Sequence, residues 1–169
     1  MQQSTIDGFF PTTGRRSFST HMNLNIRSMT GDDSARVAEF LPDLGYAVTP
    51  EILTQRLRRL LEWPDQMACV VEIEGFVVGL CQVQGVRLLA SDGYAEMQAL
   101  VVAANYQGQG LGKALLKHAI DWSVRAGYLR LRLRSGLHRA EAHQFYVAQG
   151  FTQSKASYAF ELCTEYAED

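Results

Sequence analysis

The sequence has few cysteines, no long apolar run and no excess of charge of one sign, and each shortage excludes a class of protein. The 3 cysteines are an odd number without Cys-x-x-Cys spacing, which argues against a disulfide framework or a zinc site and favours buried thiols in a reducing compartment. The most apolar runs, such as Ala99–Ala103, are about five residues long, far short of a membrane span. The 16 basic and 18 acidic residues give a net charge of -2, so no bulk positive field attracts nucleic acid or an anionic membrane. We therefore expect a cytoplasmic protein that has neither nucleic acid nor membrane as a partner.

What remains is ordinary globular composition, with 47% hydrophobic and 20% charged residues in a chain of 169. This length is typical of one domain and is sufficient for a core without disulfides or metal. Residues 1–22 are rich in Ser, Thr, Gln and Gly, show no sustained periodicity, and lack the apolar segment of an export signal. We expect a flexible leader or a non-native start over 1–22, with Met22 as a candidate internal start, and a single domain over 23–169.

Hydrophobic periodicity and turn residues predict alternating strands and helices from residue 23 onward. The predicted strands are 24–29, 67–73, 76–86, 94–102 and 129–134, with one or two more in 151–162. The predicted helices are 32–41, 50–63, 111–126 and 140–149. Glu74-Gly75 and Asp92-Gly93 are predicted turns. Strands interleaved with helices in this order predict a mixed α/β sheet with helices on both faces.

A glycine-rich loop carries the clearest chemical signal. Residues 99–113 comprise a predicted strand, then Gly108, Gly110 and Gly112, then the start of a helix. Glycines let the backbone approach an anion, and the N–H groups and dipole of the helix start bind phosphate. The alternative is a mobile loop without a ligand.

Two nucleotide-binding motifs fail at this loop. A Walker loop requires glycine five positions before the Gly-Lys pair and Ser or Thr after it, but Gln107 and Ala114 occupy those positions. A dinucleotide fingerprint requires glycine where Lys113 stands. We therefore do not expect ATP or NAD as the ligand.

A third pattern matches. Residues 107–112, Gln-Gly-Gln-Gly-Leu-Gly, have the form [Q/R]-x-x-G-x-[G/A], and residues 142–151 carry Ala-x-x-Phe-Tyr followed by Gly-Phe. With this pair of motifs, the chain resembles the GCN5-related N-acetyltransferases (GNAT superfamily) over about residues 23–162. The resemblance implies an α/β (α+β) fold with a mixed, mostly antiparallel central sheet of six to seven strands flanked by four helices.

The resemblance also implies a function, namely direct acetyl transfer from acetyl-CoA to a primary amine of a small molecule or peptide, without a covalent enzyme intermediate. Tyr146 would be the general acid that protonates the departing thiolate. Arg139 stands where many members have an asparagine that contacts the pantetheine arm, and it would contact CoA or face solvent. The residues expected to bind the cosubstrate are Leu100, Val101, Val102, Gln107, Gly108, Gln109, Gly110, Leu111, Gly112, Lys113 and Arg139.

The reaction also requires a proton acceptor, because an amine is mostly protonated at pH 7. Glu96, early on the strand before the glycine loop, is the first candidate, directly or through water, and Glu141 is the second. The alternative for Glu96 is a solvated carboxylate at the strand end. His138 and His143 are five positions apart and so do not share one helix face, and we expect no metal site.

The acceptor is left open between a small molecule and a peptide. Residues 129–134 alternate Leu and Arg, which predicts Leu129, Leu131 and Leu133 turned inward beneath a basic face. That face is either simply solvated, or it holds CoA phosphates or an acidic acceptor. A homodimer is a further expectation, since many relatives dimerise. The alternative function is a catalytically silent module that binds or senses acyl-CoA.

Overall fold

The computed structural model describes residues 23–164. Within this range the strands form one five-stranded sheet in the order β1-β2-β3-β4-β5. The strands are β1 (Leu24–Ser28), β2 (Gln66–Ile73), β3 (Phe76–Leu88), β4 (Ser91–Val102) and β5 (Leu131–Leu133). The α-helices are α1 (Ser34–Phe40), α2 (Pro50–Leu61), α3 (Leu111–Arg125) and α4 (Ala140–Ala148). Short 3-10 helices are η1 (Gly31–Asp33), η2 (Leu41–Leu44) and η3 (Ala104–Tyr106).

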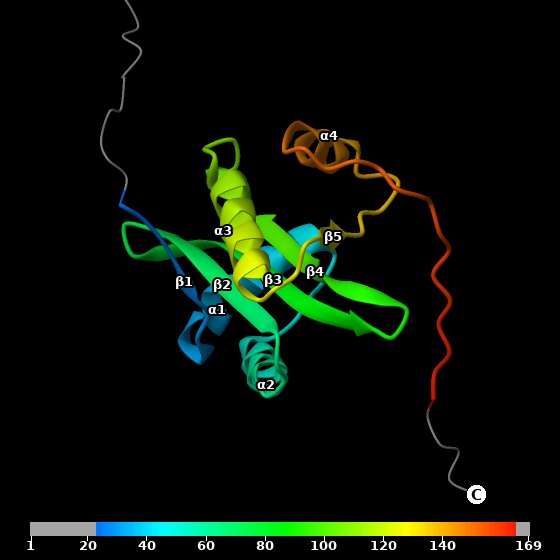
Figure 1. Ribbon diagram of the computed structural model, residues 1–169. Helices are drawn as coiled ribbons and strands as arrows, with labels where there is room; N and C mark the ends of the chain where they lie inside the picture. The colour runs from blue at the N-terminus through cyan, green and yellow to red at the C-terminus, as the bar shows by residue number, and fades with distance from the viewer. Residues whose placement is uncertain (1–22, 165–169) are drawn as a thin grey trace, which may run out of the picture.

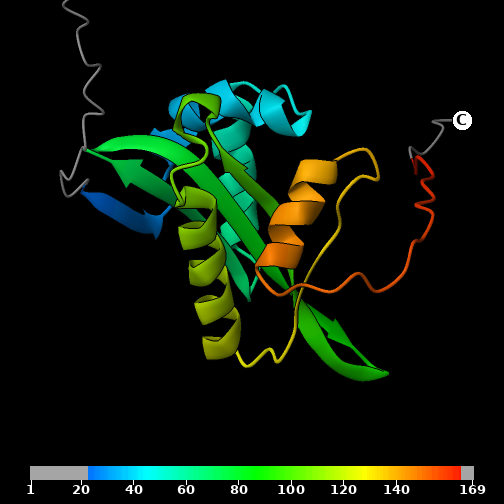
Figure 2. The same ribbon diagram turned by 90° about the horizontal axis from the view of Figure 1, so that it is seen from above.

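The sheet lies between two layers of helices (Figure 1). Seen from above, α1 and α2 cover one face of the sheet, and α3 and α4 lie on the other (Figure 2). A separate apolar cluster fills each side, with Val37 and Val70 on the α1/α2 side and Leu115 and Val83 on the α3 side. Helices on both faces confirm the mixed α/β architecture expected from the sequence.

The strand pairing leaves part of β4 without a neighbour on the β5 side. β1 to β4 pair antiparallel, whereas β5 follows the α3 crossover and pairs parallel to β4. This parallel pairing covers only Ala95 to Met97 on β4, although β4 continues to Val102. The register between β3 and β4 shifts just after Met97, and the extra residue on β4 is Gln98. A bulge bends its strand, so β4 separates from β5 at this point.

Local sequence signals explain several boundaries. The hydroxyl of Thr49 accepts a hydrogen bond from the Ile52 amide, which caps α2 as the Thr-Pro start predicts. Glu74 and Gly75 have φ angles of 51° and 82°. These two residues join β2 to β3 as a tight hairpin. The predicted helix cap and the predicted turn are both confirmed.

The prediction of six to seven strands is wrong for the described residues. Residues 151–164 form no strand, and Tyr158, Phe160 and Leu162 are 92%, 95% and 85% exposed. The strand predicted over 129–134 shortens to β5, and Leu129, expected to face inward, is 91% exposed. A strand of three residues is a poor template for a further partner, because it offers only a few backbone hydrogen bonds in total.

The predicted turn at Asp92-Gly93 is also wrong. The β3–β4 hairpin reverses at Leu89 and Ala90, and Asp92 and Gly93 lie within β4. Gly93 has a φ of 74° at a register shift, and a Cβ there would lie 2.2 Å from the Val86 carbonyl oxygen. The glycine therefore marks a bulge, which requires the same backbone freedom as a turn.

Candidate active site

The glycine loop joins the end of β4 to the start of α3. The Ala103 amide donates a 2.8 Å hydrogen bond to the Val78 carbonyl, which holds the end of β4 against β3. Gly108 and Gly110 then have φ angles of 74° and 83°, a region that glycine adopts without steric cost. Gly110 is the N-cap residue of α3. The loop therefore turns sharply into a helix N-terminus, as the motif predicts.

The start of α3 is open to an anion. The amides of Leu111, Gly112 and Lys113 have no acceptor within the helix, and among the described residues no side chain caps it. Its first turn contains no acidic residue, so nothing opposes the positive end of the helix dipole. A Cβ at Gly108 or Gly110 would have no described atom within 4 Å. These features provide both the donors and the space that a phosphate requires.

Tyr146 lies across from this helix start, on α4. Its ring packs against Phe145 at 5.3 Å and Phe151 at 5.6 Å between centroids, both edge to face. Burial raises the pKa of the Tyr146 phenol above its ordinary value, and the positive charge of Arg139 opposes that rise. The phenol is consequently protonated at neutral pH, as a proton donor must be.

One cavity of about 390 Å³ brings these parts together. It lies between the loop, the end of β4 and α4. The predicted site residues that line it are Leu100, Val101, Val102, Gln107, Gly108, Gly110, Leu111, Gly112, Lys113, Arg139 and Tyr146.

The sequence reasoning missed three lining residues, Tyr106, Ala142 and Phe145. Phe145 lies beside the first turn of α3, since a Cβ at Gly112 would be in ordinary van der Waals contact with its ring, at 3.6 Å. The signal that could have identified Ala142 and Phe145 is their place in the same motif as Tyr146, one helical turn or less away along α4.

Two predicted residues do not line the cavity. The Gln109 side chain is exposed and donates a 3.5 Å hydrogen bond to the Asn105 carbonyl. Glu96 lies on the opposite face of β4 from Ala95 and Met97, which belong to the core beneath α3. Its carboxylate is 3.3 Å from the Arg134 guanidinium and accepts a 3.2 Å hydrogen bond from Gln98. Glu96 therefore lies inside β4 rather than at a solvated end, with 14% of its side chain exposed.

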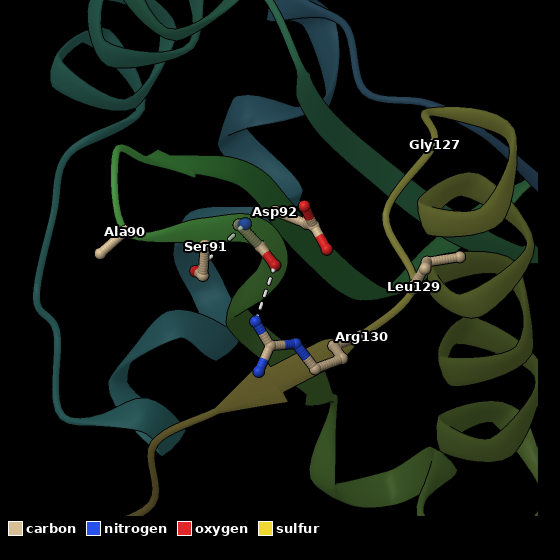
Figure 3. Close-up of a pocket in the computed structure, with 7 residues that line it drawn as sticks. Ala90, Ser91, Asp92, Gly127, Leu129 and Arg130 are labelled. Atoms are coloured by element: carbon tan, nitrogen blue, oxygen red, sulfur yellow. Dashed lines mark hydrogen bonds between the residues drawn. The ribbon is translucent and has the colours of Figure 1, made fainter.

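A second, wider hollow lies at the other end of β5, between residues 90–93 and residues 127–130 (Figure 3). Arg130 donates a 3.2 Å hydrogen bond across it to the Gly93 carbonyl. The hollow contains none of the predicted site residues.

Over residues 23–164, no group of three or more His, Cys, Asp or Glu side chains is placed to hold a metal ion. Of the helices in this range, none has the length and apolar character needed to cross a bilayer.

The comparisons agree with this geometry. The chain belongs to the acetyltransferase (GNAT) family, whose model matches residues 37–151. The uncharacterized N-acetyltransferase YhdJ of Bacillus subtilis is 46% identical over 54 residues, which cover 31% of this chain and 38% of that protein. The aminoalkylphosphonate N-acetyltransferase of Salmonella typhimurium is 37% identical over 59 residues, which cover 35% of this chain and 38% of that protein. The matches thus span little more than a third of these curated relatives.

A solved structure shows the same fold over nearly its whole length. Glucosamine-6-phosphate N-acetyltransferase from Arabidopsis thaliana superimposes with a TM-score of 0.73 over 83% of this chain and 99% of that one. Its sequence identity to this chain is 20%. The predicted resemblance to the GNAT superfamily is confirmed.

Proposed function

We propose that this protein is an acetyl-CoA-dependent N-acetyltransferase that transfers the acetyl group directly to a primary amine. The observation that carries the proposal is the cavity in which an uncapped helix start, the end of β4 that lacks a β5 partner and a half-buried tyrosine meet. Each of these parts suits one portion of an acyl-CoA molecule: a pyrophosphate, an amide-bearing arm and a thioester. The residues present therefore fit the cosubstrate.

The loop and the helix start would hold the pyrophosphate. Amides from Gln109 to Lys113 supply donors, and Gly108 and Gly110 leave room for the anion. Arg139, the N-cap residue of α4, lines the same cavity and adds a positive charge. Arg139 thus occupies the position of the usual asparagine without closing the cavity.

The end of β4 and Tyr146 would act on the thioester. Acetyl-CoA, when bound, supplies an activated acyl group. Beyond Met97 the β5 side of β4 has no strand partner, and alternate residues of a strand direct their amides to that side. Amides within Leu100 to Val102 that point this way are free to pair with the arm and to stabilise negative charge on the thioester oxygen. As the amine nitrogen forms its bond to the acyl carbon and the carbon–sulfur bond breaks, Tyr146 donates its proton to sulfur.

Glu96 would accept the proton that the amine loses. It lies on the other face of the sheet from Tyr146, next to the point where β4 and β5 separate. An acceptor approaching from that face would meet Glu96 first. Base and acid would thus act from opposite sides of the same strand.

The acceptor that we propose is a small molecule rather than a peptide. Two similar proteins are named for small acceptors, an aminoalkylphosphonate and glucosamine 6-phosphate. The homodimer and the cytoplasmic location expected from the sequence stay predictions. A silent acyl-CoA-binding module is the second candidate, favoured by the ion pair between Arg134 and Glu96, which engages the proposed base.

Two measurements test the function. Thermal denaturation with acetyl-CoA, CoA, ATP and NAD should show a shift of several degrees with the two CoA species only, since a ligand at about 100 times its Kd stabilises by about 2.7 kcal/mol. Release of free thiol from acetyl-CoA with a panel of amines then separates the candidates. Binding of CoA without thiol release would identify the silent module, and no shift with either CoA species would contradict both.

A further inference from the structure

A polar row crosses the sheet at Glu96. Gln84, Glu96 and Arg132 are direct partners on β3, β4 and β5, and direct partners point to the same face of a sheet. The residues that follow Glu96 and Arg132, Met97 and Leu133, pack in the core beneath α3. The polar row therefore lies on the opposite face, the one that α1 and α2 cover further along β4.

This placement assigns Arg139 and the arginines around β5 to different sides of the sheet, a distinction that the sequence did not make. Arg139 lines the cavity of the glycine loop. Arg132 lies between Leu131 and Leu133, which pack toward the core beneath α3, and it shares the face of Glu96. Arg134 pairs with Glu96, and Arg130 bonds to the Gly93 carbonyl. These three arginines are consequently turned away from the helix start that would bind the pyrophosphate, and their charge is directed to the acceptor side.

Each of these three arginines contacts β4 differently. Arg130 donates to the Gly93 carbonyl, and Arg132 lies over the Tyr94 ring with 4.3 Å from its guanidinium carbon to the ring centroid. Arg134 approaches Glu96 through Nε, at 3.3 Å from a carboxylate oxygen, and 79% of its side chain is exposed. Among the described residues, no hydrogen bond occupies the terminal nitrogens of Arg134. These paired donors match the geometry of a carboxylate, phosphonate or phosphate.

From this juxtaposition we propose that the acceptor is a short amine that also carries an anionic group. Glu96 receives the ammonium, and Arg134, assisted by the charge of Arg132, receives the anion. Glu96 and Arg134 are in contact, so only one or two carbon atoms separate the two charged groups of a fitting acceptor. Arg134 is thus a specificity residue, and the inference rests on the proposed function.

The test compares short amines that differ in the charge of the group at the end opposite the reacting amine. β-Alanine and 2-aminoethylphosphonate carry an anionic group beside the amine. In β-alaninamide a neutral amide replaces the carboxylate of β-alanine, and in 1,3-diaminopropane a second cation replaces it. Thiol release from acetyl-CoA gives kcat and KM for each. We expect kcat/KM for the anionic acceptors to exceed that for the amide by about 10- to 100-fold, as for charge-assisted hydrogen bonds. The ratio between the two anionic acceptors shows which anion is preferred.

Variants then locate the preference. Arg134→Met should raise KM for β-alanine by about tenfold or more and leave KM for β-alaninamide nearly unchanged, and Arg134→Lys should restore part of the difference. Arg130→Met is the matched control, since Arg130 immediately precedes β5 and also contacts β4, but through the Gly93 carbonyl and not through Glu96. This control should keep the preference for the anion.

The two failures are distinguishable. A preference for the amide or the diamine, or equal losses for both acceptors in Arg134→Met, would overturn the anionic acceptor while leaving the transferase intact. An absence of thiol release with every amine would overturn the transferase, and the acceptor class with it.

Discussion

The side-chain amide of Gln107 donates a 2.9 Å hydrogen bond to the carbonyl oxygen of Val102. The first residue of the glycine motif is thereby tied to the last residue of β4. This bond satisfies a carbonyl that has no strand partner on the β5 side, and it sets the distance between the loop and the strand end. Gln107 thus supports the loop through its side chain, in addition to any contact with a ligand.

Replacing Gln107 by alanine should weaken CoA binding by about threefold to tenfold, since one neutral hydrogen bond contributes about 0.5–1.5 kcal/mol. Titration calorimetry with CoA measures the effect. Gln55→Ala, an exposed glutamine on α2, is the control. Unchanged affinity in Gln107→Ala would show that the loop holds its shape without this bond.

Gly110→Ala should reduce CoA binding at least tenfold. The position has a φ of 83°, which costs a side chain about 1–2 kcal/mol, and relief of that strain would displace the amides at the start of α3. Gly45→Ala provides a matched control, because Gly45 has a φ of 90° and an equally open surrounding but lies away from the cavity. Equal losses of CoA affinity in both variants would point to general destabilisation instead.

Tyr146→Phe should lower kcat by about 100-fold or more with little change in the Kd for CoA, because only a proton donor is removed. The raised pKa of Tyr146 also has a kinetic consequence. The phenol donates a proton only below its pKa, so we expect the wild-type kcat to fall as pH rises above the ordinary tyrosine value of about 10, and we expect Tyr146→Phe to lack this decline. Tyr46→Phe, an exposed tyrosine, is the control, and wild-type kcat in Tyr146→Phe would exclude the general-acid role.

Glu96→Gln should lower kcat/KM by about 100-fold, most strongly at pH values where the acceptor amine is protonated. The same substitution at Glu141, an exposed residue in the first turn of α4, distinguishes the two candidate bases. A pH–rate profile unchanged in Glu96→Gln and altered in Glu141→Gln would transfer the role to Glu141.

Asp33→Asn should destabilise the fold at neutral pH by about 1–2 kcal/mol. Asp33 is 6% exposed and accepts two 2.8 Å hydrogen bonds from Arg27, which retains 35% side-chain exposure. The Arg27 guanidinium holds the pKa of Asp33 below its ordinary value.

A depressed carboxylate pKa stabilises the folded state above the unfolded pKa of about 3.9 and loses that effect as pH falls through the folded pKa. The wild-type Tm should therefore drop more steeply below about pH 4 than the Tm of Asp33→Asn. Asp43→Asn, on the exposed part of η2, should follow the wild-type curve. Parallel curves for Asp33→Asn and the wild type would contradict the role of this ion pair.

Strong local signals predicted most of the fold. Thr49-Pro50 began a helix, Glu74-Gly75 made a turn, and the glycine loop led into α3, because each depends on interactions within a few residues. Local signals failed where tertiary contacts decide. Asp92-Gly93 is as good a turn sequence as Glu74-Gly75, but the pairing of β3 with β4 places the reversal at Leu89 and Ala90.

The sequence by itself determined the glycine loop, the family and most of the residues that line the cavity beside the loop, because these follow from short contiguous motifs. Only the tertiary structure decided that β5 pairs with β4 as far as Met97 and then leaves it. The packing of Tyr146 on the α3 side places it on the opposite face of the sheet from Glu96, and the register of β5 on β4 brings Arg134 next to Glu96 rather than to the loop. Strand register sets these relationships through residues distant in sequence, which is the reason that no local pattern contained them.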